Sequence, residues 1–243
     1  WYMRNAHLPA RVLAEHSETA YMTRRAIDFI REVGDEPWSL HLSYIKPHWP
    51  YIVPSPYHNM YGVEDVLPAI RSDDERADAH PVVKAFMNHG EGVVLSDDSA
   101  RNNVIPTYMG LVKELDDHLG DLMVALSDMG RADDTFIVLT SDHGDYLGDH
   151  WLGEKELFHE PSVRIPLIVV DPSESAVAQR GASSDAFVEA IDLIPTFIER
   201  LGGDPNQPWL EGRSFLDVID GTKTESKDFV VAELDYFARK ARL

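Results

Sequence analysis

Phe136-Ile137-Val138-Leu139-Thr140-Ser141-Asp142-His143-Gly144 is the stretch of this sequence that decides the fold class. Its first part, residues 136–140, is almost continuously apolar and rich in β-branched side chains, which is typical of a strand buried in a parallel sheet. The polar end of the stretch, with its glycine, marks the passage from strand to loop. A second apolar run, Ile165 to Val170, is closed by Asp171-Pro172. The two runs predict buried strands of a mainly parallel sheet.

Helical patterns lie on both sides of these runs. Apolar residues recur at helical spacing between Met22 and Val33, with Gly34 as the predicted stop. They recur again over 106–129, where Pro106 would occupy the first turn. Shorter helices are predicted near 81–89 and over 195–201, and one more strand over 38–45. Helices that alternate with buried strands predict an α/β fold, a mainly parallel sheet flanked by helices.

The composition limits the classes of partner. The 243 residues include 22 Lys and Arg against 42 Asp and Glu, a net charge of −20, and such a surface repels nucleic acid and anionic membranes. No apolar run approaches the length of a bilayer span. From the charge and the lack of such a run, neither nucleic acid nor membrane is an expected partner. The chain has no cysteine, which excludes a disulfide, a thiolate metal site or a cysteine nucleophile within it.

An acidic residue and a histidine follow the apolar run 136–140. Ligands bind beyond the carboxyl ends of strands in open α/β sheets, and Asp142 and His143 lie at such a place. Asp offers a hard oxygen and His a borderline nitrogen, so the pair suits a divalent ion such as Mn²⁺, Zn²⁺ or Ca²⁺. The alternative is that Asp142 caps its own loop beside a surface histidine. The residues alone leave both interpretations open.

Two more residues could act on an anionic group. Lys155, in the same loop as the Asp-His pair, could neutralise a substrate oxyanion as a point charge. The competing interpretation is a solvated lysine paired with Glu154 or Glu156. His48 lies between two prolines and could donate a proton to a leaving group or bind an anionic oxygen. Its alternative is a histidine that merely stacks on Trp49.

Taken together, these segments and their order resemble one family, the sulfatase branch of the alkaline phosphatase superfamily. The resemblance runs from about Ala26 to Phe215. It is carried by Lys46-Pro47-His48-Trp49-Pro50, Thr140 through His150, Gly153-Glu154-Lys155, Arg164 through Ile168, Asp192 through Thr196, and Glu211-Gly212-Arg213-Ser214. The segments Tyr44 through Pro50 and Gly153 through His159 are most similar to bacterial phosphonate monoester hydrolases, which also cleave sulfate esters and phosphodiesters.

The resemblance implies an alkaline phosphatase/sulfatase-like fold and a role for each candidate residue. Asp142 and His143 would be ligands of one divalent metal, with Mn²⁺ favoured and Ca²⁺ or Zn²⁺ as alternatives. Lys155 would contact the non-bridging oxygens of the substrate, and His48 its leaving-group side. The substrate would be a small anionic ester: a phosphonate monoester, a sulfate ester or a phosphodiester. The resemblance also implies a homo-oligomer. A cytoplasmic location is expected, with a periplasmic one left open because the sequence begins at Trp1.

The nucleophile of such enzymes is a hydrated formylglycine made from the first residue of a Cys/Ser-x-Pro-x-Arg motif, and this sequence lacks that motif. It has no cysteine, and no serine is followed by Pro and Arg at the required offsets. The resemblance therefore implies the C-terminal half of a hydrolase, with the formylglycine in a missing N-terminal half, and we expect the chain alone to be inactive. Residues 1–215 would be the C-terminal portion of the catalytic domain. Residues 216–243 would be a C-terminal extension or the start of a small subdomain.

Two other functions stay open on the sequence. A phosphodiesterase or metal-dependent phosphomutase of the same superfamily would need two metals, and therefore more His and Asp ligands than one pair supplies. A non-catalytic sulfatase-like lobe or pseudoenzyme would bind an anion or a partner. The missing nucleophile favours this second function, whereas the intact Asp142, His143, Lys155 and His48 argue against it.

Overall fold

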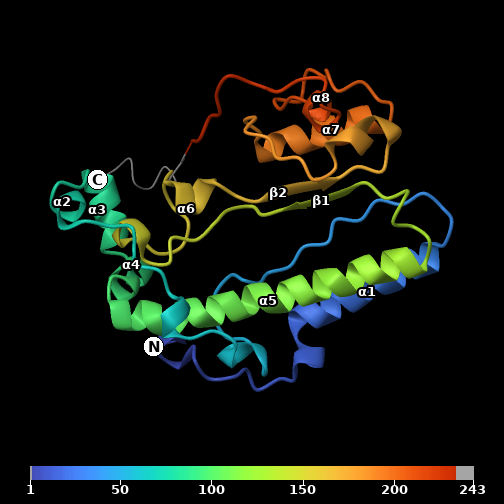
Figure 1. Cartoon of the computed structure of the whole chain (residues 1–243). Coiled ribbons are helices and arrows are strands. Elements are labelled where there is room, and N and C mark those ends of the chain that lie inside the picture. Colours follow the sequence, from blue (N-terminus) through green and yellow to red (C-terminus); the bar gives the residue numbers. More distant parts are fainter. Residues whose placement is uncertain (1, 234–243) are drawn as a thin grey trace. The chain divides into compact units, whose positions relative to one another are not determined.

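The computed structural model describes residues 2–233 and divides into two compact units (Figure 1). Within that range, unit 1 comprises residues 2–133 and 144–156, and unit 2 comprises residues 134–143 and 157–233. The chain therefore leaves unit 1, enters unit 2, returns to unit 1 for one loop and ends in unit 2. No helix in the described range has both the length and the apolar character that a membrane crossing requires.

Two long helices, α1 (Glu18–Val33) and α5 (Asp98–Asp128), lie side by side and form the frame of unit 1 (Figure 1). Helix α1 begins where the Ser17 hydroxyl oxygen accepts the Ala20 N–H at 3.1 Å. It ends at Gly34, whose φ of 64° is a conformation that glycine adopts without strain. The helix predicted between Met22 and Val33, with Gly34 as its stop, is confirmed.

Helix α5 begins well before the predicted start. The Asp97 carboxylate accepts a backbone N–H of the first turn, and the turns that follow bury Arg101 and Val104. Pro106 therefore lies inside the helix, and its predicted place in the first turn is wrong. A proline in a helix interior removes one N–H donor, but capping and the burial of neighbouring side chains here hold the preceding turns in the helix.

The rest of unit 1 is built from short helices joined by extended chain. These are η1 (Tyr2–Asn5), η2 (Ala14–His16), η3 (Tyr57–Asn59), η4 (Val63–Asp65), α2 (Asp73–Ala77), α3 (Pro81–Met87), α4 (Gly90–Leu95) and η5 (Asp149–Trp151). Helix α3 confirms the helix predicted near 81–89. The strand predicted over 38–45 is wrong, because this extended segment pairs with no strand in the described residues. Its side chains lie against α1 instead: the Tyr44 and Thr23 hydroxyl oxygens are 2.8 Å apart.

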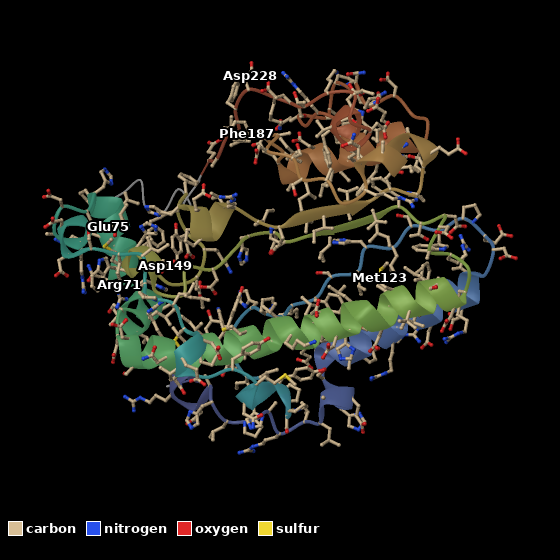
Figure 2. The ribbon with its side chains drawn as sticks, viewed as in Figure 1. Arg71, Glu75, Met123, Asp149, Phe187 and Asp228 are labelled. Carbon is tan, nitrogen blue, oxygen red and sulfur yellow. The ribbon has the colours of Figure 1, made fainter. Side chains whose placement is uncertain are left out.

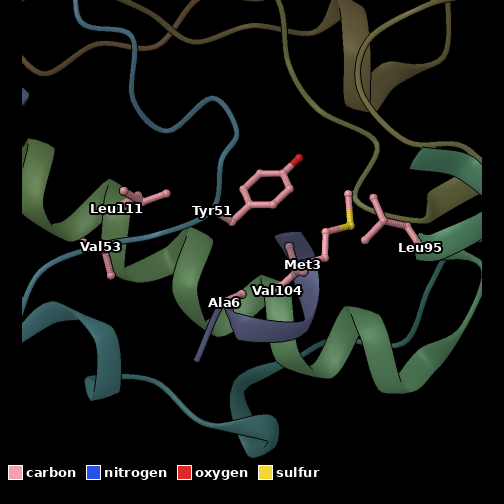
Figure 3. Close-up of a cluster of buried hydrophobic side chains, with 7 residues drawn as sticks. All are labelled: Met3, Ala6, Tyr51, Val53, Leu95, Val104 and Leu111. Carbon is pink, nitrogen blue, oxygen red and sulfur yellow. The ribbon is translucent and has the colours of Figure 1, made fainter. Parts of the chain in front are cut away.

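The apolar core of unit 1 joins segments that are far apart in the sequence (Figure 3). It is made of Met3, Ala6, Tyr51, Val53, Leu95, Val104 and Leu111. Burial of each larger side chain contributes about 1.5–3 kcal/mol, so this cluster fixes the segment that carries Tyr51 against α4 and α5. The Tyr51 ring lies in the cluster while its hydroxyl group points away from it (Figure 3).

Unit 2 contains the only sheet in the described residues, a pair made of β1 (Ile137–Thr140) and β2 (Leu167–Val170). The pair is antiparallel, with Ile137 opposite Val170 and Thr140 opposite Leu167. The predicted parallel arrangement is therefore wrong for these two strands. A parallel pair needs a crossover that usually contains a helix, and residues 141–166 hold only the one-turn elements η5 and α6 (Glu160–Val163). Both apolar runs are strands as predicted, but Ile168 is 57% exposed rather than buried.

The remaining elements of unit 2 are η6 (Glu174–Gln179), η7 (Ala190–Asp192), α7 (Leu193–Arg200) and α8 (Leu216–Ile219). Helix α7 confirms the helix predicted over 195–201. Asp192 is fully buried and accepts the N–H groups of Glu189 and Arg213, while the Lys227 ammonium lies 2.6 Å from its Oδ2. The boundary predicted at 215/216 stays a prediction, and residues 234–243 of the predicted C-terminal segment lie outside the described residues.

Candidate functional site

His48 stands on a short loop of unit 1, residues 46–50, that folds around a lysine of its own. The Lys46 ammonium donates to the His48 carbonyl at 3.1 Å and to the Pro50 carbonyl at 2.7 Å. The His48 Nδ1 atom lies 2.9 Å from the Trp49 carbonyl oxygen. A carbonyl oxygen can only accept, so Nδ1 carries the ring proton in this contact. The other ring nitrogen, Nε2, is left to act on a neighbour.

The second element of the site is the loop 144–156, which returns the chain to unit 1. It closes on itself, because Tyr146 N–H donates to the Glu154 carbonyl at 2.8 Å and Gly148 N–H to the Leu152 carbonyl at 2.9 Å. Tyr146 and Leu152 are fully buried, so they anchor this loop in unit 1. Several non-glycine residues have positive φ, among them His150 (54°). Such backbone is strained and persists only where surrounding contacts hold it.

Lys155 and His48 meet in unit 1. The Lys155 Nζ atom lies 3.1 Å from the His48 Nε2 atom, although 107 positions separate the two residues in the sequence. An ammonium group only donates, so Nε2 accepts through its lone pair in this arrangement. The structure thus brings together the two residues predicted to act on the substrate. The lysine cation can bind an anionic oxygen, and the imidazole nitrogen beside it can hold a proton.

A tyrosine that the sequence analysis missed joins the two segments of this site. The Tyr51 hydroxyl donates to Asp145 Oδ2 at 2.7 Å, and Asp145 Oδ1 accepts the Leu147 N–H at 3.0 Å. Burial, with the negative charge of Asp145, raises the pKa of Tyr51, so the phenol stays protonated and remains a donor. The link ties the segment just after His48 to the loop that carries Lys155. No local pattern could have revealed it.

Asp142 and His143 lie in unit 2, directly beyond the end of β1, as predicted. The Ser141 hydroxyl donates to the His143 carbonyl at 2.7 Å, and the His143 N–H donates to Asp142 Oδ1 at 3.0 Å. The other carboxylate oxygen, Oδ2, lies 3.5 Å from His143 Nε2. Ligands about 2.0–2.2 Å from one metal ion lie about 3 Å apart, so this oxygen and nitrogen fit two positions around a divalent ion. The Asp142 side chain is 85% exposed and accessible to such an ion.

Charged residues of unit 1 surround the tip of the loop 144–156, where Arg71, Glu75 and Asp149 gather (Figure 2). The His150 Nδ1 atom lies 2.6 Å from Glu75 Oε1. The Trp151 ring has the Arg71 guanidinium 4.3 Å from its centre, on a cation–π contact. These contacts hold the strained tip against α2 and the segment before it. The sequence analysis missed them because they join residues from distant parts of the chain.

This chain is similar to proteins of one known family. The family model described as Sulfatase matches residues 2–203. The multifunctional alkaline phosphatase superfamily protein PehA of Trinickia caryophylli is 35% identical over 242 residues, which cover 94% of this chain and 46% of that protein. An arylsulfatase of Clostridium perfringens is 27% identical over 217 residues, 88% of this chain and 44% of the arylsulfatase.

Solved structures give the same result. The phosphonate monoester hydrolase of Silicibacter pomeroyi has a TM-score of 0.82 at 29% identity, over 92% of this chain and 44% of that enzyme. The phosphonate monoester hydrolase of Agrobacterium radiobacter has a TM-score of 0.81 at 28% identity, over 88% of this chain and 44% of that enzyme. These matches confirm the alkaline phosphatase/sulfatase-like fold expected from the sequence.

The chain spans less than half the length of each of these relatives, and the family resemblance is to their C-terminal half, as the sequence analysis implied. The matched region includes every candidate residue, from His48 to Lys155. The family model covers most of the chain and, together with the two structural matches, shows its family. The chain belongs to the sulfatase family of the alkaline phosphatase superfamily.

Proposed function

We propose that this chain supplies substrate-binding and metal-binding residues to a metal-dependent hydrolase of small anionic esters. The substrate classes are phosphonate monoesters, sulfate esters and phosphodiesters. The observation that carries the proposal is the distance of 3.1 Å between Lys155 Nζ and His48 Nε2. A protein with a net charge of −20 repels anions over its surface, so a fixed cation at the site is needed to attract one.

Lys155 and His48 would divide the work on the substrate. The Lys155 ammonium binds the non-bridging oxygens, where negative charge increases in the transition state. The His48 Nε2 atom faces the leaving-group side, where a proton held on the ring stabilises the departing oxygen. The Nδ1–H contact with the Trp49 carbonyl keeps the ring in one orientation throughout. When a substrate oxygen accepts the hydrogen bond that Lys155 otherwise donates to Nε2, the Nε2 atom becomes available to hold this proton.

Asp142 and His143 would hold one divalent metal ion, with Mn²⁺ favoured and Ca²⁺ or Zn²⁺ as alternatives. Their facing oxygen and nitrogen, 3.5 Å apart, support this assignment. When bound, the ion supplies Lewis-acid stabilisation of the substrate oxygens. Two protein ligands do not complete the coordination of such an ion, so further ligands must come from other groups.

The printed sequence offers neither a cysteine nor a serine in the formylglycine motif. We therefore propose that the 243 residues alone do not turn over substrate, and that a formylglycine nucleophile comes from outside them. The acidic surface favours neither a nucleic acid nor a membrane as partner. A homo-oligomer, proposed from the family resemblance, would be tested by light scattering. A cytoplasmic location is also proposed, with a periplasmic one as the alternative, and cell fractionation would distinguish them.

The decisive experiment replaces Lys155 by alanine in the full product of the gene. With Mn²⁺ present, the kcat/KM for an aryl phosphonate monoester and an aryl sulfate should fall about 100- to 1000-fold, as expected when a group that stabilises an oxyanion is lost. Lys84→Ala, at an exposed lysine of α3, is the matched control and should leave the rate unchanged. A rate near that of the wild type for Lys155→Ala would refute the role of Lys155. Metal-dependent hydrolysis by the 243 residues alone would refute the proposed inactivity.

A further inference from the structure

We propose that Lys46 is a positioning residue, which holds the imidazole ring of His48 in one orientation and one tautomer. This inference rests on the proposed function of His48, and it adds a residue that the sequence analysis passed over. Two backbone contacts of Lys46 and the charges around its ammonium group support this role.

The Lys46 ammonium binds the carbonyls of His48 and Pro50, at 3.1 and 2.7 Å. The carbonyl between them in the sequence, that of Trp49, is the one that accepts from His48 Nδ1. One cation therefore fixes the peptide groups on both sides of the acceptor that orients the ring. Without that cation, both carbonyls lose a charged donor, and the Trp49 carbonyl between them is held less firmly.

The Lys46 side chain is half-buried, and its charge depends on its surroundings. Burial lowers the pKa of Lys46, while the negative charges of Glu18 and Glu114 act in the opposite direction. Glu18 is the first residue of α1 and Glu114 lies on α5, so the two long helices of unit 1 together support the ammonium form. The loop of His48 is thereby joined electrostatically to the frame of the unit.

Glu114 is an unusual carboxylate because it is only 1% exposed. The Ser17 hydroxyl donates to it, and Ser17 is the residue that caps α1. Its Oε1 atom has no hydrogen-bond partner among the described residues. A buried carboxylate with an unsatisfied oxygen is costly, and a nearby cation compensates part of that cost. The position therefore favours a lysine ammonium at residue 46 over a neutral side chain.

The test measures the His48 ring directly and needs no catalysis. The chain is labelled with ¹⁵N-histidine, and the His48 signals are assigned by their loss in His48→Gln. Because protonated and unprotonated ring nitrogens differ in ¹⁵N shift, the wild type should show Nδ1 protonated and Nε2 unprotonated at a pH above the histidine pKa. Lys46→Gln should shift both signals toward an average of the two tautomers. Lys46→Arg should restore most of the wild-type pattern, and Lys84→Gln should not change it.

Unchanged His48 shifts in a folded Lys46→Gln variant would overturn the proposal. Should that variant not fold, Lys46→Met decides the matter, because it removes the ammonium group and keeps an unbranched side chain at this half-buried position. A shift in the same direction supports the proposal, and no shift overturns it. In the full gene product, Lys46→Gln should lower kcat about tenfold to a hundredfold with little change in KM, as a misplaced group does. An active Lys155→Ala enzyme would refute the proposed function, whatever the His48 spectra show.

Discussion

Replacement of Tyr51 by phenylalanine should loosen the loop 144–156 without disturbing the apolar core. The Tyr51 ring is 2% exposed and would keep its place, because phenylalanine has the same ring. Only the hydroxyl group is lost, together with its hydrogen bond of 2.7 Å to Asp145 Oδ2. The substitution therefore tests one link between the segment that carries His48 and the loop that carries Lys155.

The expected magnitude follows from the type of bond. A hydrogen bond to a charged group contributes about 1.5–3 kcal/mol, and its loss takes one donor from the Asp145 carboxylate, which also accepts the Leu147 N–H. Since about 1.4 kcal/mol corresponds to a factor of ten, opening of the loop should become about ten to a hundred times more frequent.

The assay is amide hydrogen exchange of residues 144–156, combined with urea unfolding followed by tryptophan fluorescence. Tyr108→Phe is the matched control, because the Tyr108 and Tyr51 rings are neighbours at 6.2 Å and both belong to unit 1. Burial and the charge of Asp145 raise the pKa of Tyr108 to about 12, so the control also removes a protonated phenol. Its effect should stay within about 0.5 kcal/mol. Equal exchange rates in the two variants would refute the importance of the Tyr51–Asp145 bond.

Two further predictions concern buried acidic residues. Burial raises the pKa of Glu114, so the folded protein binds this proton more tightly than the unfolded chain, and the free energy of unfolding should fall as pH rises from the unfolded to the folded pKa. Glu114→Gln should flatten this fall in urea titrations across that range, and an unchanged slope would contradict the assignment. In unit 2, Asp192→Asn should cost about 1.5–3 kcal/mol, because the Lys227 ammonium loses its fully buried partner and keeps only Glu189. Thermal unfolding would measure this loss, and a cost below about 1 kcal/mol would show that Glu189 alone compensates the charge of Lys227.

The sequence predicted those helices whose signals are local. For α1, apolar spacing and a terminal glycine mark both the helix and its end. For α5 the same spacing located the helix but not its start, because proline favours a first turn, and the burial that carries the helix past Pro106 is not visible in the local sequence. The direction of β1 relative to β2 could not be predicted, since an apolar run looks the same in either pairing.

The residues of the candidate site also fall into two groups: those that a local sequence signal located, and those that come together only in the folded chain. Asp142 and His143 are neighbours in the sequence, and their place beyond a strand followed from the apolar run before them. The meeting of His48 with Lys155 came only from the family resemblance, because nothing in either segment specifies the other. The roles of Tyr51 and Lys46 depend on where a hydroxyl and an ammonium group come to lie after folding. Such contacts have no periodicity, and therefore leave no trace in a single sequence.

The path of the chain between the two units restricts how this protein can be altered by recombination. A gene segment that ends at residue 133 would encode unit 1 without Tyr146 and Leu152, two of its fully buried side chains, and without Lys155. A segment covering 134–233 would carry the loop of the other unit as an unsupported insertion. Exchange of one unit with a relative can therefore preserve both cores only if both segments of that unit are replaced, which takes three junctions, at 133/134, 143/144 and 156/157. A substitution in the loop 144–156 must therefore be compatible with the body of unit 1, because Tyr146 and Leu152, which anchor the loop of Lys155, are buried there.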